Sequence, residues 1–379
     1  MYYISIIYSA VSLGGLTFCY FPPSVPKQLQ NKTRWQAFRE LEFVGFGLFT
    51  AGLPVCLLGL SWAGSPGHAW GSASVIAPIV IGALLIIGAV VHDLNVAGDA
   101  NAFLPPRLLY RFREYTSHLV VGFVTGMIYF TNAGLLPQAN LDLFTNDPTQ
   151  IGINLLPNGF GQLFFSTVVP ALLHLSKTPR IFIILAIFLQ TLFVGLYAWA
   201  IPDHRAGWMA FQFFGQGCFD LIVTCCIVNI SLHVNQSDLG LAIGIFGAAR
   251  NFGGSLGIAI FNTILNNSVS SQLAPRISEA AISNGFSATN LGALIPAVIN
   301  NAIGVPNAFA SVPGGVNEAV TYATFQAFRQ AYTYAYRIVF YSTIPFGIVS
   351  LVVSLFITDA GKYMTNHVAV HVQNRALHL

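Results

Sequence analysis

Long apolar runs separated by shorter polar segments dominate the pattern along this chain. A run of about 20 apolar residues is long enough to cross a bilayer as a helix. The pattern predicts nine such helices, at residues 2–21, 43–63, 73–92, 116–137, 152–175, 180–201, 207–232, 239–264 and 334–357. We therefore expect an all-α polytopic membrane protein.

Composition supports this prediction and narrows the classes of partner. Of the 379 residues, 55% are hydrophobic and only 8% are charged, whereas about 25% of the residues in a soluble domain are charged. A net charge of +3 does not indicate a nucleic-acid partner, and the bilayer is the expected environment. All the cysteines fall within apolar runs, without the spacing of a metal site or a disulfide framework, so we expect no cofactor and no metal.

The basic residues predict how the chain is oriented. Connections that face the cytosol carry an excess of Lys and Arg. Alternate connections hold eleven of the sixteen, namely Lys27, Lys32, Arg34, Arg39, Arg107, Arg111, Arg113, Lys177, Arg180, Lys362 and Arg375. The opposite set holds Arg205, Arg276 and Arg329. The first set is therefore predicted to be cytosolic, which places the C-terminus in the cytosol and the N-terminus outside.

The same pattern divides the chain into segments. Residues 22–42 and 93–115 are expected to be cytosolic linkers, and 359–379 a cytosolic tail. Residues 43–92 contain two helices almost without polar residues, typical of accessory, lipid-facing helices. Residues 116–358 are expected to form a six-helix bundle with a long outer loop at 266–332.

Polar residues within the apolar runs recur every four positions, so that they lie above one another on a helix. Residues 152–175 and 207–232 each carry a column of this kind, and 116–137 has polar residues compatible with one face. The residues are Asn154, Asn158, Gln162 and Ser166; Gln212, Gln216, Asp220 and Thr224; and His118, Thr125, Tyr129 and Asn132. Each residue either joins helices by hydrogen bonds or lines a solvated cavity.

Two charges stand near the middle of predicted helices, Asp220 and Arg250. A charge at that depth is unfavourable in hydrocarbon and usually faces protein or water. One interpretation is a pair that handles substrate or protons, because an intramembrane carboxylate exchanges a proton when its surroundings change. The other is a fixed ion pair that holds two helices together.

Glycines recur around Arg250. Gly240 and Gly244, and Gly253 and Gly257, are four residues apart, and Gly254 adjoins the second pair. Small residues at this spacing allow two helices to approach closely, so we expect these five glycines to pack against other helices.

Catalytic motifs are weak or missing. Residues 253–257 match the G-x-S-x-G pattern, but that motif requires a strand before the serine and a helix after it. No G-x-x-x-x-G-K-[ST] sequence indicates ATP binding. We therefore do not expect an enzyme.

Four segments together resemble one family. They are Phe21-Pro22-Pro23, Glu42–Trp62 (EFVGFGLFTAGLPVCLLGLSW), Ala248–Gly257 (AARNFGGSLG) and Asp359–Val372 (DAGKYMTNHVAVHV). The chain resembles fungal fourteen-spanner major facilitator transporters of the drug:H⁺ antiporter, trichothecene-efflux and siderophore-transporter kind. The resemblance implies that residues 1–21 are the last helix of the N-terminal half and that the chain corresponds to the C-terminal two-thirds of the fold. The first five helices of the family would then be missing.

The function expected from this resemblance is proton-coupled efflux of a toxin or drug across the plasma membrane. The partners would be a small-molecule substrate, protons, lipid, and a missing N-terminal half or a full-length homologue. The expected pathway residues are Asp220, Arg250, Asn158, Gln162, Gln212, Gln216, Tyr129 and Asn132. Siderophore–iron uptake and a truncated membrane protein without transport activity remain the alternatives.

Overall fold

The computed structural model describes residues 2–20, 35, 42–63, 68, 70–93, 95, 105–235, 238–310, 312–313 and 315–364. Over these residues it contains helices and no strand, which confirms the all-α fold class. The chain forms two units, Met1–Leu41 with Met364–Leu379, and Glu42–Tyr363. The first unit contains helix α1 (Tyr2–Cys19). All further description concerns the second unit, because it contains the predicted site.

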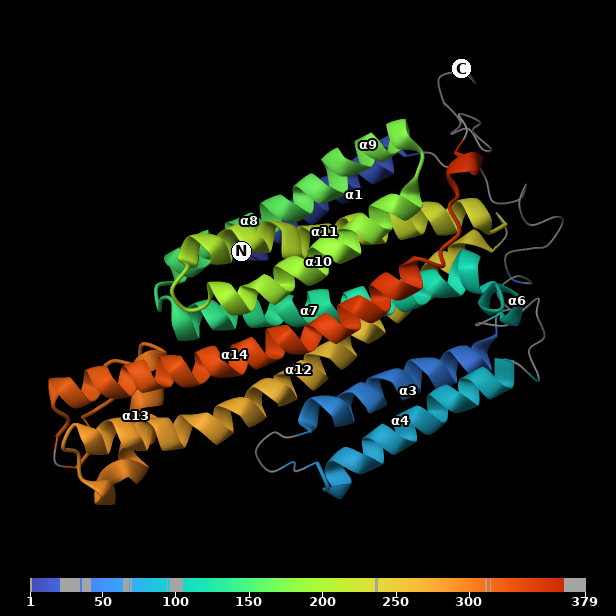
Figure 1. Cartoon of the computed structure of the whole chain (residues 1–379). Helices are drawn as coiled ribbons and strands as arrows, with labels where there is room; N and C mark the ends of the chain where they lie inside the picture. The colour runs from blue at the N-terminus through green and yellow to red at the C-terminus, as the bar shows by residue number, and fades with distance from the viewer. Residues whose placement is uncertain are drawn as a thin grey trace. The chain divides into compact units, whose positions relative to one another are not determined.

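The helices of the second unit follow one another with short connections (Figure 1). Their bounds are α3 (Phe43–Trp62), α4 (Ala73–His92), α6 (Pro106–Leu109), η3 (Phe112–Thr116), α7 (Ser117–Leu143), α8 (Pro148–Leu163), η4 (Phe164–Val168), α9 (Val169–Ser176), α10 (Pro179–Ala200), α11 (Arg205–His233), α12 (Leu239–Ser283), η5 (Ala288–Asn290), α13 (Leu291–Ala302), α14 (Glu318–Ser354) and η6 (Gly361–Tyr363).

Seven helices within the described ranges are long and apolar enough to cross a membrane. They correspond to α3, α4, η3 with α7, α10, α11, α12 and α14. Nine were expected from the sequence. The first expected span falls on α1, of which the apolar stretch Ser5–Cys19 is shorter. The fifth falls on α8, η4 and α9, where a π-helical turn interrupts the α-helix before Pro170, a residue that has no backbone N–H to donate.

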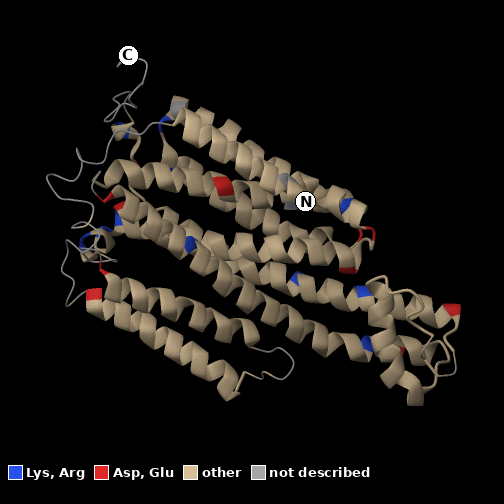
Figure 2. Cartoon of the chain, turned by 180° about the vertical axis from the view of Figure 1, so that it is seen from behind, with Lys and Arg blue, Asp and Glu red and all other residues tan. Residues whose placement is uncertain are grey.

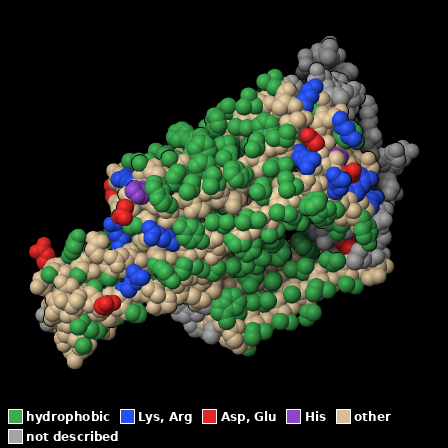
Figure 3. Space-filling model, viewed as in Figure 1, with side chains coloured by type: hydrophobic (Ala, Val, Ile, Leu, Met, Phe, Trp, Pro, Cys, Tyr) green, Lys and Arg blue, Asp and Glu red, His purple; other side chains and the backbone are tan. Residues whose placement is uncertain are grey.

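Helices α3 and α4 form a close antiparallel hairpin. Glycines make the approach tight: a Cβ at Gly52 would lie 2.8 Å from the Leu85 Cβ, and a Cβ at Gly82 would lie 2.7 Å from the Cys56 Cα. Only Val75, Gly82 and Ala89 are buried on α4, while Leu84 is 62% exposed. Figure 3 shows that hydrophobic side chains cover much of the visible face, as expected of helices that contact lipid.

The remaining long helices pack around α7. Their shared core joins Met127 of α7, Tyr197 of α10, Trp208 of α11, Phe261 of α12 and Phe340 of α14. The Tyr197 ring lies 5.4 Å from both the Trp208 and the Phe340 ring centroids. Figure 2 shows charged side chains mainly near the helix ends, with long uncharged stretches between them.

The outer segment differs from the prediction. Residues 266–332 were expected to form a long loop, but α12 continues without interruption to Ser283 and α14 begins at Glu318. With 45 residues, α12 is about 68 Å long at 1.5 Å per residue, about twice the thickness of the hydrocarbon core. These extensions and α13 enclose a second hydrophobic core that includes Ile277, Leu294 and Phe328.

Local backbone and side-chain contacts set the end of α12 and the start of α14. Gly285 has φ +86°, and the Phe286 N–H donates to the Ala281 carbonyl at 3.0 Å. A left-handed glycine followed by such a bond is a common helix C-terminus. At the start of α14, the Asn317 side chain accepts the Ala319 N–H at 3.0 Å, which is the usual arrangement of an N-cap.

Candidate functional site

Polar side chains from four helices meet on one half-buried face of the bundle. Tyr129 comes from α7, Asn158 and Gln162 from α8, Asp220 from α11 and Arg250 from α12, and each is partly exposed. All five were predicted from the sequence as pathway residues.

The side chains of this group interact with one another. Gln162 Nε2 donates to Asn158 Oδ1 at 2.7 Å, and the Gln162 side chain interacts with the Tyr129 hydroxyl. The charge of Arg250 acts on both Tyr129 and Asp220. The group therefore combines a carboxylate, a guanidinium, a phenol and two amides.

Phe219 is a buried aromatic residue of this site that was not predicted from the sequence. Its ring stacks on Tyr129, with centroids 3.9 Å apart and planes at 6°. The Arg250 guanidinium carbon lies 5.8 Å from the Phe219 ring centroid, within the range of a cation–π contact. In the sequence, its one signal was its position directly before Asp220. Through these contacts the Phe219 ring links α11 to Tyr129 of α7 and to Arg250 of α12.

Asp220 and Arg250 do not form a direct ion pair in this conformation. Within the described part of the chain, no carboxylate oxygen lies within 4.0 Å of the Arg250 guanidinium. The Arg250 Nε is buried and has no hydrogen-bond partner there. A fixed ion pair, one of the two interpretations drawn from the sequence, is therefore absent from this conformation, in which the two charged groups lie more than 4.0 Å apart.

Glycines allow α12 to pack closely against α7 near Arg250. A Cβ at Gly257 would lie 2.7 Å from the Met127 carbonyl oxygen, and one at Gly254 would collide with the Phe130 ring. A Cβ at Gly253 would collide with the Phe123 backbone, and one on Gly126 of α7 with the Arg250 carbonyl. The two backbones therefore touch at Arg250 and over the two turns that follow it.

The expectation for Gly240 and Gly244 is wrong. A Cβ at either position would have nothing within 4 Å, so these glycines pack against no neighbouring helix. They line a recess between α12 and α3 instead. The reason is that α3 lies beside this end of α12 without reaching its glycine face.

The other predicted pathway residues are fully buried. Asn132 donates to the Ile128 carbonyl of its own helix at 2.7 Å, and Gln212 Nε2 donates to the Asn154 carbonyl at 3.3 Å. The Gln216 amide has no partner among the residues that the structure describes. All three have 0% exposure, so in this structure they lie between helices and line no open surface.

A second polar network ties α7, α8 and α11 together near one end of the bundle. Asn154 Nδ2 donates to Asn140 Oδ1 at 2.9 Å, and Arg205 Nε donates to Asn154 Oδ1 at 2.8 Å. Arg205 also reaches Gln150 at 2.7 Å. The Asn154 side-chain amide, side-chain oxygen and backbone carbonyl bond Asn140, Arg205 and Gln212, respectively. Asn154 therefore joins α8 to α7 and α11.

One acidic cluster with a histidine lies at the start of the hairpin. The ligand atoms of Glu42, His92 and Asp93 lie within 4.8 Å of one another. However, both Glu42 oxygens accept backbone N–H groups, from Gly45 at 2.8 Å and Phe46 at 3.2 Å. His92 Nδ1 lies 3.0 Å from Glu42 Oε1. These contacts make Glu42 the N-cap of α3, and we assign the cluster a structural role.

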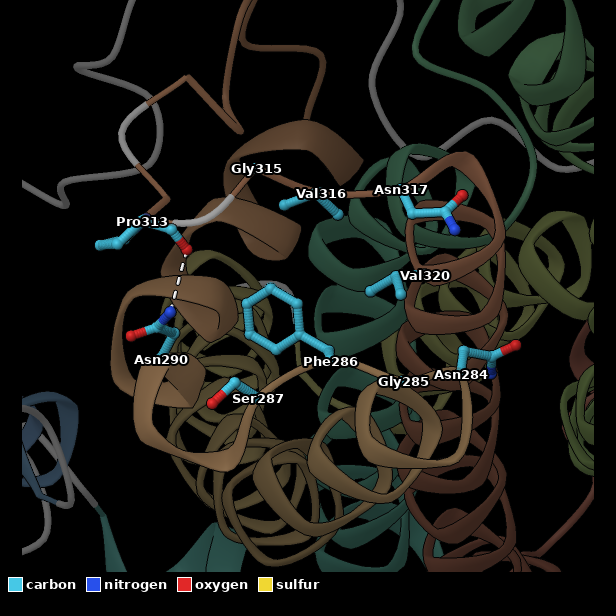
Figure 4. Close-up of a pocket in the computed structure, with 10 residues that line it drawn as sticks. All are labelled: Asn284, Gly285, Phe286, Ser287, Asn290, Pro313, Gly315, Val316, Asn317 and Val320. Carbon is cyan, nitrogen blue, oxygen red and sulfur yellow. Dashed lines mark hydrogen bonds between the residues drawn. The ribbon is translucent and has the colours of Figure 1, made fainter.

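The outer segment contains a cavity of about 520 Å³. Figure 4 shows the Phe286 side chain at its centre, with Val316 opposite. Asn290 Nδ2 closes one side by donating to the Pro313 carbonyl at 3.0 Å (Figure 4). The described lining carries no charged side chain, so the cavity lacks the titratable groups of the Asp220 face.

A family model and the similar proteins of known name agree on one family. A family model for fungal trichothecene efflux pumps matches residues 1–377. A trichothecene efflux pump of Fusarium sporotrichioides is 25% identical over 380 residues, covering 99% of this chain and 62% of that protein. An MFS-type transporter of Penicillium rubens is 26% identical over 366 residues, covering 95% of this chain and 64% of that protein. The chain thus spans less than two-thirds of the length of these relatives.

Proposed function

Because the chain belongs to the fungal trichothecene efflux pump family, a group of major facilitator transporters, we propose that it exports a small organic molecule in exchange for protons. The observation that carries this proposal is the convergence of Asp220, Arg250 and Tyr129 on one half-buried face. Titratable groups within membrane-spanning segments are energetically unfavourable and often mark a substrate or ion pathway.

Asp220 is the proposed proton carrier. Its carboxylate is half-buried and has no cation within 4.0 Å among the described residues, so it binds a proton when Arg250 is distant. Movement of Arg250 towards it favours the ionised form and releases the proton, because an opposite charge within about 4–6 Å stabilises a carboxylate.

Substrate would bind between the Tyr129 ring and the amides. The partly exposed Tyr129 ring, stacked on the buried Phe219 ring, offers an apolar surface, while Asn158 and Gln162 supply neutral donors and acceptors. Such a face suits a largely apolar molecule that carries hydroxyl or carbonyl groups. It discriminates weakly between related substrates, because apolar contacts are tolerant of shape.

Alternating access needs two halves that rock around a midplane site. We propose that an N-terminal half, or a full-length homologue, covers the face that carries Asp220. The excess of Lys and Arg in one set of connections supports a cytosolic C-terminus. Export of a toxin would place the protein in the plasma membrane.

The experiment measures toxin efflux at external pH 5 and pH 7 from sensitive yeast cells that express the chain together with the N-terminal half of a full-length homologue, because alternating access needs two halves. If one proton is exchanged per substrate, each pH unit supports about a tenfold concentration ratio. We expect Asp220→Asn to abolish this pH dependence. The matched control is Asp203→Asn, which changes an exposed carboxylate and should leave transport unchanged.

Two results would overturn the proposal. If Asp220→Asn keeps both the transport rate and its pH dependence, Asp220 does not carry the proton. If cells that express the unaltered chain with this N-terminal half export no more toxin than cells that express the half alone, the chain does not act as the second half of a transporter. Co-expression of a full-length homologue then tests whether the chain acts as its partner.

A further inference from the structure

A recess of about 420 Å³ lies between α3 and the first turns of α12. Phe46, Phe49 and Leu53 line it from α3, and Leu241 and Ile245 line it from α12. Gly244 leaves its floor open, because nothing lies within 4 Å of a Cβ built there. Figure 3 shows a hollow bordered by hydrophobic side chains.

The dimensions of the recess suit a hydrocarbon chain. Its volume is within the range of about 300–1,000 Å³ typical of small-molecule sites. The α3 residues from Phe46 to Pro54 rise about 12 Å at 1.5 Å per residue, close to one leaflet of a bilayer with a core of about 30 Å. Thr50 is the single hydroxyl group among the described lining residues, so little of the lining favours a polar molecule.

One end of the recess lies beside a guanidinium. Arg107 Nη2 is 3.0 Å from Asp238 Oδ1, and Asp238 precedes Gly240 of the recess by two positions. The Tyr115 hydroxyl also donates to the Ala242 carbonyl at 2.9 Å, which holds the segment containing Arg107 against α12. These two contacts fix Arg107 at the end of the recess.

Arg107 retains the capacity to bind a phosphate. Its side chain is 41% exposed, and a guanidinium has five N–H donors, of which Asp238 occupies one. The next arginine, Arg111, lies 3.5 Å from Glu114. A guanidinium fork matches phosphate oxygens in geometry and charge.

We propose that this recess binds a membrane phospholipid, with one acyl chain between α3 and α12 and the phosphate on Arg107. The chain fills an interface that the protein leaves open at Gly240 and Gly244, and it joins the hairpin to the bundle. This role is separate from the Asp220 face and independent of transport.

The experiment uses the full chain, delipidated in detergent micelles, and native mass spectrometry to measure bound lipid. The two probes are dioleoyl phosphatidic acid and dioleoylglycerol, which share acyl chains and differ in the phosphate. We expect the phosphatidic acid to bind about tenfold more tightly, because only it contacts Arg107. Arg107→Gln should remove this preference, and Arg111→Gln should keep it.

The acyl site is tested by filling the recess. Gly244→Leu should weaken both lipids about tenfold, which corresponds to roughly two methylene groups losing their burial. Gly247→Leu is the control, because Gly247 also has nothing within 4 Å of its Cβ but does not line the recess. Ala248→Leu fills the recess one turn further along and replaces Gly244→Leu if that variant does not fold.

Each contrary result refutes a defined part of the proposal. Equal binding of the two probes, or an unchanged preference in Arg107→Gln, refutes the phosphate contact. Unchanged affinity in both recess-filling variants refutes the acyl site. An equal loss in Gly247→Leu and Gly244→Leu shows nonspecific binding to the helix surface, which also overturns the assignment.

Discussion

Replacing Gly253 by alanine tests how closely α7 and α12 approach. The added Cβ would lie 2.7 Å from the Phe123 carbonyl carbon and 3.0 Å from its Cα. Both are backbone atoms, so no side-chain rotation relieves the overlap. The helices must separate by about 1 Å, and overpacking of this kind destabilises by about 1–3 kcal/mol. We expect a loss near the upper end, about 2–3 kcal/mol.

Gly244 provides the matched control on the same helix. A Cβ there meets nothing within 4 Å, and alanine is favoured over glycine within a helix by up to about 1 kcal/mol. Gly244→Ala should therefore stabilise slightly. The two substitutions are chemically identical, so the difference between them isolates the contact with Phe123.

The assay is reversible unfolding in mixed detergent micelles, followed by tryptophan fluorescence. Gly253→Ala should lower the free energy of unfolding relative to Gly244→Ala by about 3 kcal/mol, the sum of both effects. Equal stability of the two variants would refute the close approach.

Three further substitutions test other contacts. Tyr336→Phe removes the hydroxyl that donates to the buried Asp142 Oδ2 at 2.7 Å, and should lower the unfolding free energy by about 1–3 kcal/mol; Tyr334→Phe, at a 43% exposed tyrosine, should change it little in the same unfolding titration. Asn154→Leu removes both hydrogen bonds of a side chain with 0% exposure and should destabilise by about 1–3 kcal/mol, the penalty of leaving the buried Asn140 side chain unpaired; unchanged stability would contradict the network. Glu42→Ala removes the α3 N-cap, so amide hydrogen exchange at Gly45 and Phe46 should accelerate about fivefold, as expected for a cap worth about 1 kcal/mol, while exchange in α10 should not change.

The spacing of polar residues predicted which of them share a helix face. It did not predict whether that face packs against another helix or stays exposed. Gln212, Gln216 and Asp220 share one face of α11 by their spacing. Asp220 is half-exposed, whereas Gln212 and Gln216 are fully buried. The spacing is identical along the column, and the difference comes from α7, α8 and α10, which cover one end of it.

The glycines of α12 also show that residue spacing alone does not predict which helix packs against a face. Gly240 and Gly244 have the same spacing as Gly253 and Gly257. Only the second pair meets α7. A small residue permits close approach, but a neighbouring helix must cross at that height, and the crossing point depends on residues remote in sequence.

Residues 266–332 were predicted as a loop because they lie between the apolar runs at 239–264 and 334–357. The structure shows that a helix continues through polar residues when its further turns find a partner. Ile277 and Ala281 pack with Leu294 of α13. Hydropathy therefore located the apolar part of this helix but not the end of the helix.

The length of α12 has a mechanical consequence. From Arg250 to Ser283 the helix is uninterrupted and rises about 50 Å at 1.5 Å per residue. A rotation of about 10° around the height of Arg250 would move its outer end by about 9 Å, given that length. The α13 segment therefore acts as the tip of a lever, and a fluorophore placed there would magnify small movements near Asp220 into a signal that single-molecule methods can follow.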